Sequence, residues 1–367
     1  MNTTSFVLYD VFYDQAKEGS IDYPVLHNSS HERGFVQVAL FGIFACVWSL
    51  VFNSLLILLI VCQSQVRSQF VFNHVISLSI SDFLYSSLVD IITAYYDLMP
   101  WKLGPHVCKA WMILDVMIPF VSLLIIIILN LDRLLFAISP ISYFRLFHRK
   151  IFRLAALVLP WIIGSVIVVP LWLLTSTVEP KPGMCIYGIT QEAAVTSSVI
   201  SLFLPCVFII ILTVFILATL IGGLPQDLNE FVSLTFNGSD RTSTKTIKKK
   251  HTGVVVALTF VNFFTLVLQL PFGAISILQP ECMDPTCSST LKMLQALSWL
   301  RSANPGIRPV FWILITELRH ICCSCCDVTS TSSNEMRLME MTSVTNTNLT
   351  NEPILSEHSP EEMNKQV

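Results

Sequence analysis

The chain has 367 residues, of which 53% are hydrophobic and only 13% are charged, and its formal net charge at pH 7 is −3. Soluble domains carry about a quarter charged residues, so a chain with a mean hydropathy of +0.66 needs lipid around it. The small net charge provides no electrostatic footprint for nucleic acid. Composition therefore argues against a soluble domain and against a nucleic-acid partner, and it favours an integral membrane protein.

Seven apolar stretches are long enough to cross a bilayer, since a span needs roughly 20 mostly apolar residues. We expect these spans at Phe35–Val61, Val71–Tyr95, Ala110–Leu131, Ile151–Leu174, Ala193–Leu220, Gly253–Leu278 and Leu291–Ile315. The predicted fold class is an all-α membrane protein, a seven-transmembrane helix bundle over residues 35–321. It lies between an extracellular tail, residues 1–34, and a cytosolic segment, residues 322–367.

Basic residues gather in two of the links between spans. They are Arg145, Arg149, Lys150, Arg153, Arg241, Lys245, Lys248, Lys249 and Lys250. Cytoplasmic links carry an excess of Lys and Arg, so we expect a multi-pass protein of the plasma membrane with its N-terminus extracellular. The first 34 residues contain no apolar signal-peptide core, and the first span is expected to act as the signal anchor. Asn2 and Asn28 then head glycosylation sequons on the lumenal side.

Two cysteine pairs fall on the oxidising side of this arrangement. Cys108 precedes the third span and Cys185 follows the fourth, so a disulfide between them would tie that loop to the third helix. Cys282 and Cys287, in the last outer loop, are a second candidate pair that would close a small ring.

Four cysteines follow the seventh span: Cys322, Cys323, Cys325 and Cys326. They are too crowded for a good tetrahedral zinc site, which usually takes two ligand pairs from separate segments. Palmitoylation is the favoured interpretation, and the acyl chains would hold a short surface helix against membrane lipid. The remaining tail, Asp327–Val367, is rich in Ser, Thr, Asn and Glu and is expected to be disordered, with phosphorylation sites.

Ionisable residues inside the spans are costly, at roughly 2.5 to 3.5 kcal/mol near the midplane, and each is a functional hypothesis whose alternative is a structural ion pair. They are Asp82, Asp115, Arg133, Arg301 and Arg308, with Asp90 as an additional case. Asp115 and Arg133 are 18 residues apart, so they share a face of the third helix about 27 Å apart, with Ser122 near the same stripe. That geometry suits a relay between an outer ligand and an inner effector.

Several residues occur at characteristic positions along the seven predicted spans and the links beside them. They are Asn53, Leu78, Asp82, Trp101, Asp132, Arg133, Pro140, Tyr143, Trp161, Pro205, Pro271, Phe272, Asn304 and Pro305. Together they resemble the pattern of the rhodopsin-like (class A) G-protein-coupled receptors, nearest to the biogenic-amine branch, over residues 35–326. No cofactor is implied, since Ser298 stands where an opsin carries its retinal-binding Lys.

The resemblance implies a ligand site near the outer ends of the helices. In amine receptors an Asp seven residues after the bridged third-helix Cys binds the ligand ammonium, and Asp115 stands seven after Cys108. Three fifth-helix serines resemble the hydroxyl-binding serines of catecholamine receptors, although Ser in a membrane helix often bonds to its own backbone. They are Ser197, Ser198 and Ser201.

The sixth helix departs from the amine-receptor pattern. Gln269 replaces the usual Trp, and Phe272 remains from the aromatic cage that would surround an ammonium. The cation–π contribution of that cage is correspondingly reduced.

The inner switch that the resemblance implies also departs from the pattern. It comprises Asp132, Arg133, Asn304, Pro305 and Arg308. Arg308 replaces the Tyr that usually follows Asn-Pro, Leu134 replaces the Tyr of the third-helix signature, and His251 stands where many relatives have an acidic partner for Arg133. We expect Arg301 to pair with Asp82, near Ser122, and to replace the sodium ion that many relatives hold there, because buried opposite charges must pair.

The function expected from these residues is a receptor, not an enzyme, that couples an extracellular amine-like ligand to a heterotrimeric G protein and engages arrestin. One alternative is a peptide receptor that uses the acidic, tyrosine-rich segment over residues 9–23. A second is a receptor-like protein that does not couple. A membrane transporter is the alternative of another class, but the spans show no repeated halves.

Overall fold

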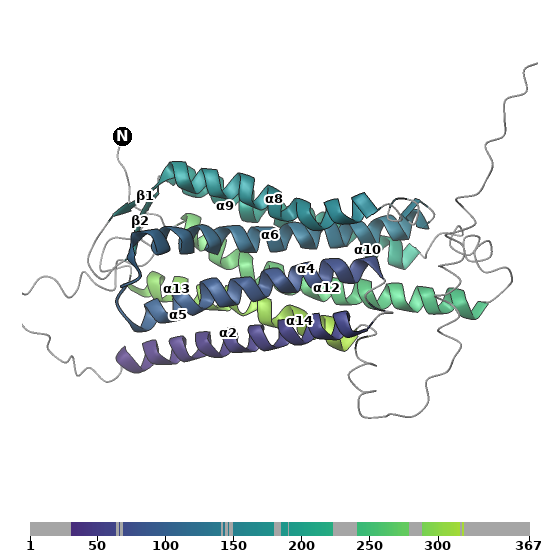
Figure 1. The fold of residues 1–367 in the computed structure, drawn as a ribbon, viewed down its shortest axis with the longest axis horizontal. Helices are drawn as coiled ribbons and strands as arrows, with labels where there is room; N and C mark the ends of the chain where they lie inside the picture. Colours follow the sequence, from purple (N-terminus) through teal and green to yellow (C-terminus); the bar gives the residue numbers. More distant parts are fainter. Residues whose placement is uncertain are drawn as a thin grey trace, which may run out of the picture.

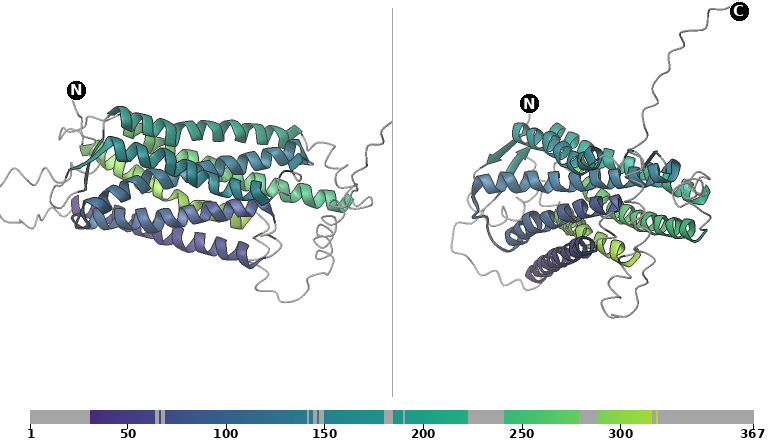
Figure 2. Two further views of the ribbon diagram at one scale, coloured as in Figure 1. Left: turned by 45° about the horizontal axis from the view of Figure 1, so that its top comes forward. Right: turned by 45° about the vertical axis from the view of Figure 1, so that its right-hand side comes forward.

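The structure is a computed structural model in which the helices run alongside one another in an elongated bundle (Figure 1), and Figure 2 shows the same packing from two other sides. It describes residues 31–63, 66, 69–140, 142–143, 146, 150–179, 185–189, 191–222, 241–278, 288–315 and 318. The helical elements are α2 (His31–Cys62), α4 (Phe70–Tyr85), η1 (Ser86–Asp90), α5 (Ile91–Leu98), α6 (Gly104–Ile138), α8 (Lys150–Thr175), α9 (Gln191–Ser198), η2 (Val199–Phe203), α10 (Leu204–Gly222), α12 (Arg241–Leu278), α13 (Ser288–Ser302) and α14 (Asn304–Ile315).

The predicted membrane bundle is confirmed. Six helical stretches of the described chain are long and apolar enough to cross a membrane: Leu40–Cys62, Phe70–Tyr96, Gly104–Ile138, Lys150–Thr175, Glu192–Gly222 and Lys248–Ile275. The seventh predicted span is present as α13 and α14. Large apolar side chains cover the outside of the bundle, among them Ile151, Val166 and Phe215, as a lipid environment requires.

The seventh span is divided because of Pro305. Proline has no amide proton and its ring clashes with the carbonyl four residues earlier, which belongs to Arg301. The chain therefore leaves the helix after Ser302, turns at Ala303 and begins α14 at Asn304.

Two π-helical turns interrupt other spans. η2 lies just before Pro205 at the start of α10, where the proline cannot donate to the carbonyl of Ser201. A wider turn accommodates this loss, and such turns are frequent at functional sites. η1 divides the second span between α4 and α5, and it ends at Asp90.

One end of the bundle carries a short antiparallel hairpin, so the all-α expectation holds for the spans but not for this loop. Strand β1 (Ser176–Glu179) pairs with β2 (Ile186–Ile189), with Ser176 opposite Ile189. Figure 1 shows both strands at the left-hand end of the molecule. The predicted disulfide is confirmed: Cys185, just before β2, is bonded to Cys108 of α6. We call this the disulfide end and the opposite one the Arg133 end.

Helix α6 lies at the centre and packs against α4, α8 and α10. Its side chains belong to two apolar clusters. The cluster toward the disulfide end is built around Trp101, Trp111 and Trp172. The cluster toward the Arg133 end includes Leu129 of α6 and Trp312 of α14. Polar residues between these clusters are therefore held away from lipid.

The contact between α14 and α2 depends on a glycine. The Trp48 indole Nε1 donates to the Gly306 carbonyl oxygen at 3.1 Å, and a Cβ placed at Gly306 would lie 2.8 Å from Trp48 Cδ1. We predict that Gly306→Val lowers the melting temperature of the purified protein, because such overpacking costs about 1–3 kcal/mol. The matched control is Gly222→Val, since a Cβ there meets nothing within 4 Å. Equal melting temperatures for the two variants would contradict the prediction.

Candidate functional site

Asp115 and Arg301 form an ion pair in the half of the bundle nearer the disulfide end. Arg301 Nη2 of α13 donates to Asp115 Oδ1 of α6 at 2.6 Å, and the Tyr85 hydroxyl of α4 donates to the same oxygen at 3.0 Å. The guanidinium carbon lies 4.4 Å from the ring centroid of Phe272 on α12. The side chains of Arg301 and Asp115 are 13% and 24% exposed. The pair therefore joins four helices and stays accessible.

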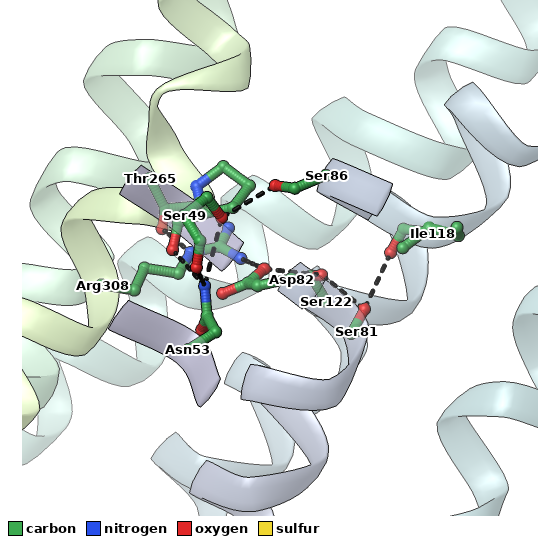
Figure 3. A network of polar contacts seen from close by, with 10 residues as sticks. Ser49, Asn53, Ser81, Asp82, Ser86, Ile118, Ser122, Thr265 and Arg308 are labelled. Atoms are coloured by element: carbon green, nitrogen blue, oxygen red, sulfur yellow. Dashed lines mark hydrogen bonds and ion pairs between the residues drawn. The ribbon is translucent and has the colours of Figure 1, made fainter. Parts of the chain in front are cut away.

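A second ion pair lies deeper in the bundle. Arg308 Nη1 of α14 donates to Asp82 Oδ1 of α4 at 2.6 Å, and both side chains are 2% exposed. Arg308 Nε donates to Thr265 Oγ1 of α12 at 3.3 Å, and the Ser122 hydroxyl of α6 lies 3.5 Å from Asp82 Oδ1. Figure 3 shows these groups converging from four helices. This pair is sealed from solvent and fixes the relative positions of its helices.

The prediction that Arg301 pairs with Asp82 is wrong. Arg301 lies on α13, on the disulfide-end side of the break at Ala303, and it meets Asp115 beside Tyr85. Arg308 lies seven residues further, on α14, and reaches Asp82. Each guanidinium thus pairs with the carboxylate at its own level along the bundle. The predicted association of Ser122 with Asp82 is present.

Hydroxyl and amide groups extend the deeper network toward α2. Ser122 and Ser81 share a hydrogen bond of 2.8 Å (Figure 3). Asn53 Nδ2 donates to the Pro305 carbonyl oxygen at 3.0 Å. Asn304 is fully buried, and neither of its side-chain polar atoms bonds to another described residue. The Asn-Pro pair is therefore held to α2 through the carbonyl of Pro305.

The signature residues of α6 form a compact cluster at the Arg133 end. Arg133 Nε and Nη2 donate to Oδ2 of the preceding Asp132 at 2.7 and 2.5 Å, and Nη2 donates to the Tyr143 hydroxyl at 3.1 Å. The His251 ring of α12 lies 4.9 Å from the ring of Phe136. Within the described residues no ion pair joins Arg133 to α12. An aromatic contact stands where an acidic partner is usual, and the switch role of this cluster stays a prediction.

The three serines predicted to meet a ligand are differently placed. The Trp172 indole Nε1 donates to the Ser197 hydroxyl at 3.2 Å, and the Ser201 hydroxyl donates to the Ser197 carbonyl oxygen at 2.7 Å. Ser198 is half-buried. Two of the three hydroxyls thus have partners inside the protein.

Gln269 and Phe272 lie one turn apart on α12 and share a face. Gln269 is buried, and its Oε1 accepts no hydrogen bond from the described residues. Phe272 packs against Arg301. The ring predicted to face a ligand ammonium therefore faces a guanidinium of the protein itself.

Tyr85 carries a contact that no sequence motif indicates, since its hydroxyl holds Asp115 and its ring lies 5.9 Å from the Arg301 guanidinium. The sequence offers one indication of this contact: Tyr85 stands three residues after Asp82, so the two side chains share a face of the helix.

Several other predicted sites lie outside the described residues. These are Asn2, Asn28, the Cys282–Cys287 pair and the four cysteines Cys322, Cys323, Cys325 and Cys326 with their surface helix.

Because the Asp82–Arg308 pair is fully buried, removing one partner leaves the other charge without compensation, at a cost of about 3–5 kcal/mol. We predict that Asp82→Asn and Arg308→Gln each lower the melting temperature strongly, and that the double variant recovers much of the loss. Thermal unfolding of the purified protein measures the three values. A double variant as unstable as the sum of the single variants would contradict this pairing.

The Asp82–Arg308 pair also bears on sodium binding. Arg308, and not Arg301 as first expected, supplies the positive charge that would replace a sodium ion at Asp82. A guanidinium at Asp82 leaves no net charge there for a cation to neutralise. Ligand affinity is therefore expected to be equal in sodium and potassium buffers. Sodium dependence that disappears in Asp82→Asn would show that the ion still binds.

The sequence was compared with known proteins. The family model described as 7 transmembrane receptor (rhodopsin family) matches residues 52–312. The D(1B) dopamine receptor of Xenopus laevis is 24% identical over 312 residues, covering 75% of this chain and 66% of that receptor. The D(1)-like dopamine receptor of Oreochromis mossambicus is 22% identical, covering 77% of each chain.

A third relative, the Alpha-1A adrenergic receptor of Oryzias latipes, is 27% identical over 174 residues, which is 46% of this chain and 36% of that receptor. The chain spans just under two thirds of the length of the Xenopus D(1B) receptor. The family model covers most of the chain and all the residues of the two ion pairs. The protein therefore belongs to the rhodopsin family of seven-transmembrane receptors, a family of multi-pass membrane receptors and not of enzymes.

Proposed function

We propose that this protein couples an extracellular ligand that carries an amine to a heterotrimeric G protein. The observation that carries the proposal is Asp115: a partly exposed carboxylate, seven residues after the disulfide-bonded Cys108, in the half of the bundle nearer the disulfide end. A carboxylate in a bundle of low dielectric binds an ammonium more strongly than a neutral group does. The names of the dopamine and adrenergic receptor relatives support an amine as the ligand class.

The orientation in the plasma membrane follows from charge and from the disulfide. The basic links at the Arg133 end favour the cytosol for that end, and a disulfide forms in an oxidising compartment. Asp115 then lies toward the extracellular side, where a ligand arrives. Arg133 lies toward the cytosol, where a G protein would bind.

The ligand has to compete with the protein's own cation. Arg301 Nη2 occupies Asp115 Oδ1, the oxygen that an ammonium would also contact. An amine that takes this oxygen breaks the link between α6 and α13. Ligand binding is thereby coupled to the position of the seventh span, through a contact that exists only in the ligand-free state.

Helix α6 carries the effect to the other end, since it contains both Asp115 and Arg133. The buried pair of Asp82 and Arg308 lies between them and holds α14 while α13 is released. At the Arg133 end, Arg133 is held by Asp132 and Tyr143 without an ion pair to α12 among the described residues. Movement of α12 would therefore not have to break an ion pair there.

We predict that biogenic amines bind the wild-type receptor and dissociate its G protein, and that Asp115→Ala abolishes both responses. Arg301→Gln removes the internal competitor, so amine affinity should rise about 10-fold. Radioligand binding and G-protein dissociation in the same cells measure the two steps separately. Unchanged responses in Asp115→Ala would refute an amine bound at Asp115.

The alternatives appear as other outcomes of this experiment. Deleting residues 1–25 should leave amine affinity unchanged, whereas a peptide receptor that uses the acidic tail would lose its ligand. Amine binding without G-protein dissociation would identify a receptor-like protein that does not couple. Arrestin recruitment, read in the same cells, tests that further partner.

A further inference from the structure

Asp90 is a buried acid to which the proposed function gives no role. It is the last residue of η1 and is 1% exposed. Ser86 and Ser302 lie beside it, but within the described residues neither carboxylate oxygen accepts a hydrogen bond of normal geometry. An ionised carboxylate in such surroundings is unfavourable until a positive group pairs with it.

The π-helical turn η1 relates Asp90 to Tyr85, which is a neighbour of Arg301. A π-helix joins residue i to residue i+5, so Asp90 stands one turn beyond Tyr85, whose ring lies 5.9 Å from the Arg301 guanidinium. Ser302, which follows Arg301 in the chain, is one of the two hydroxyl residues beside Asp90. Asp90 and Asp115 thus interact electrostatically with one guanidinium, while the hydrogen-bonded pair is the one with Asp115.

Among the described residues here, the two carboxyl groups of Asp90 and Asp115 share one guanidinium, so one more positive charge is needed when both are ionised. A ligand ammonium supplies that charge. It reaches Asp115, whose side chain is 24% exposed, and it does not reach Asp90, which is buried. Taking Asp115 Oδ1 displaces Arg301, and the loss of the ion pair between Arg301 and Asp115 would oppose binding strongly.

We propose that the ligand ammonium displaces Arg301 from Asp115 and that the Arg301 guanidinium moves to Asp90. The inference rests on the receptor function proposed above and narrows the ligand to a monocation. One ion pair is present before the exchange and two after it, because Asp90 gains a hydrogen-bonded counter-charge only when Arg301 arrives. Asp90 is thus a specificity-determining residue that the ligand never touches.

The exchange also selects against ligands that carry an acid group. A zwitterion brings its own carboxylate to Arg301 and holds the guanidinium away from Asp90, so the buried acid stays unpaired. A monoamine should therefore bind more tightly than the amino acid from which it derives. The movement of Arg301 to Asp90 would also draw Ser302, at the end of α13, toward η1, while Arg308 keeps α14 in place.

A double-mutant cycle, measured without ligand, tests whether the Arg301 guanidinium can form an ion pair with Asp90. In Asp115→Asn the guanidinium can still pair with Asp90, whereas in Asp90→Asn/Asp115→Asn both of these carboxylates are gone. The melting temperature of the double variant should fall roughly 5 °C further than the sum of the single variants predicts. Adding Arg301→Gln to this double variant should restore the melting temperature. The control pair Asp82→Asn/Asp115→Asn should be additive and not rescued by Arg301→Gln, because Arg308 serves Asp82.

Additive losses in the Asp90 cycle, or a double variant that Arg301→Gln does not restore, would overturn the exchange. If the double variant fails to express, the triple variant decides: recovery supports the exchange and continued failure overturns it. These outcomes require no ligand, so they are independent of whether amines are the natural agonists.

Amine binding provides the second measurement. With dopamine and 3,4-dihydroxyphenylalanine as the monocationic and zwitterionic probes, Asp90→Asn should weaken dopamine binding about 10-fold in the wild type and about 2-fold or less in Arg301→Gln. Wild-type receptor should bind dopamine more tightly than 3,4-dihydroxyphenylalanine, which differs from it only by the carboxylate. Equal weakening in both backgrounds would overturn the role of Asp90. Failure of every biogenic amine to bind, with a positive ligand-free cycle, would instead refute the amine ligand and retain the pairing of Arg301 with Asp90.

Discussion

A charge inside a lipid-embedded helix bundle has to meet an opposite charge, because neither water nor lipid is there to solvate it. This constraint organises the centre of the receptor. Asp82 of α4 holds Arg308 of α14, and Asp115 of α6 holds Arg301 of α13. The two halves of the seventh span are therefore fastened separately, one to the second span and one to the third. Thr265 and Ser122 add hydrogen bonds to the attachment between Asp82 and Arg308.

The interruptions in the helices make separate attachment possible. A continuous seventh helix would carry Arg301 and Arg308 as one rigid rod, two turns apart. The turn at Ala303, which Pro305 imposes, separates them, and the π-helical turn η1 places Asp90 one wide turn beyond Tyr85. Irregular backbone is tolerated at this depth because it is surrounded by protein. The same irregularities allow one ion pair to change while the other persists.

Membership of the rhodopsin family accounts for the scaffold, the disulfide and the α6 signature, but the polar centre has features of its own. The carboxylate that would receive an amine is already paired with a guanidinium, and the ring that would face an ammonium packs on that guanidinium. At the other end, His251 stacks near Phe136, and Arg133 turns to Asp132 and Tyr143. A receptor built in this way starts from a self-paired state, and the amine ligand proposed here would have to compete with Arg301 for Asp115.

The seven spans, the cysteine pair that ties the hairpin loop to α6 and the identity of the buried charges could be predicted from the sequence, because run length, cysteine position and residue type are local properties. It could not determine which arginine meets which aspartate. Two acids and two bases allow more than one pairing, and a helical period gives the face of a side chain but not its neighbour on another helix. The same holds for Ser197, which accepts a hydrogen bond from Trp172, and for Asp90 beside Ser302. Only the tertiary structure decided these contacts, since the break at Ala303 and the packing of α4, α6 and α13 set the level and rotation of each helix.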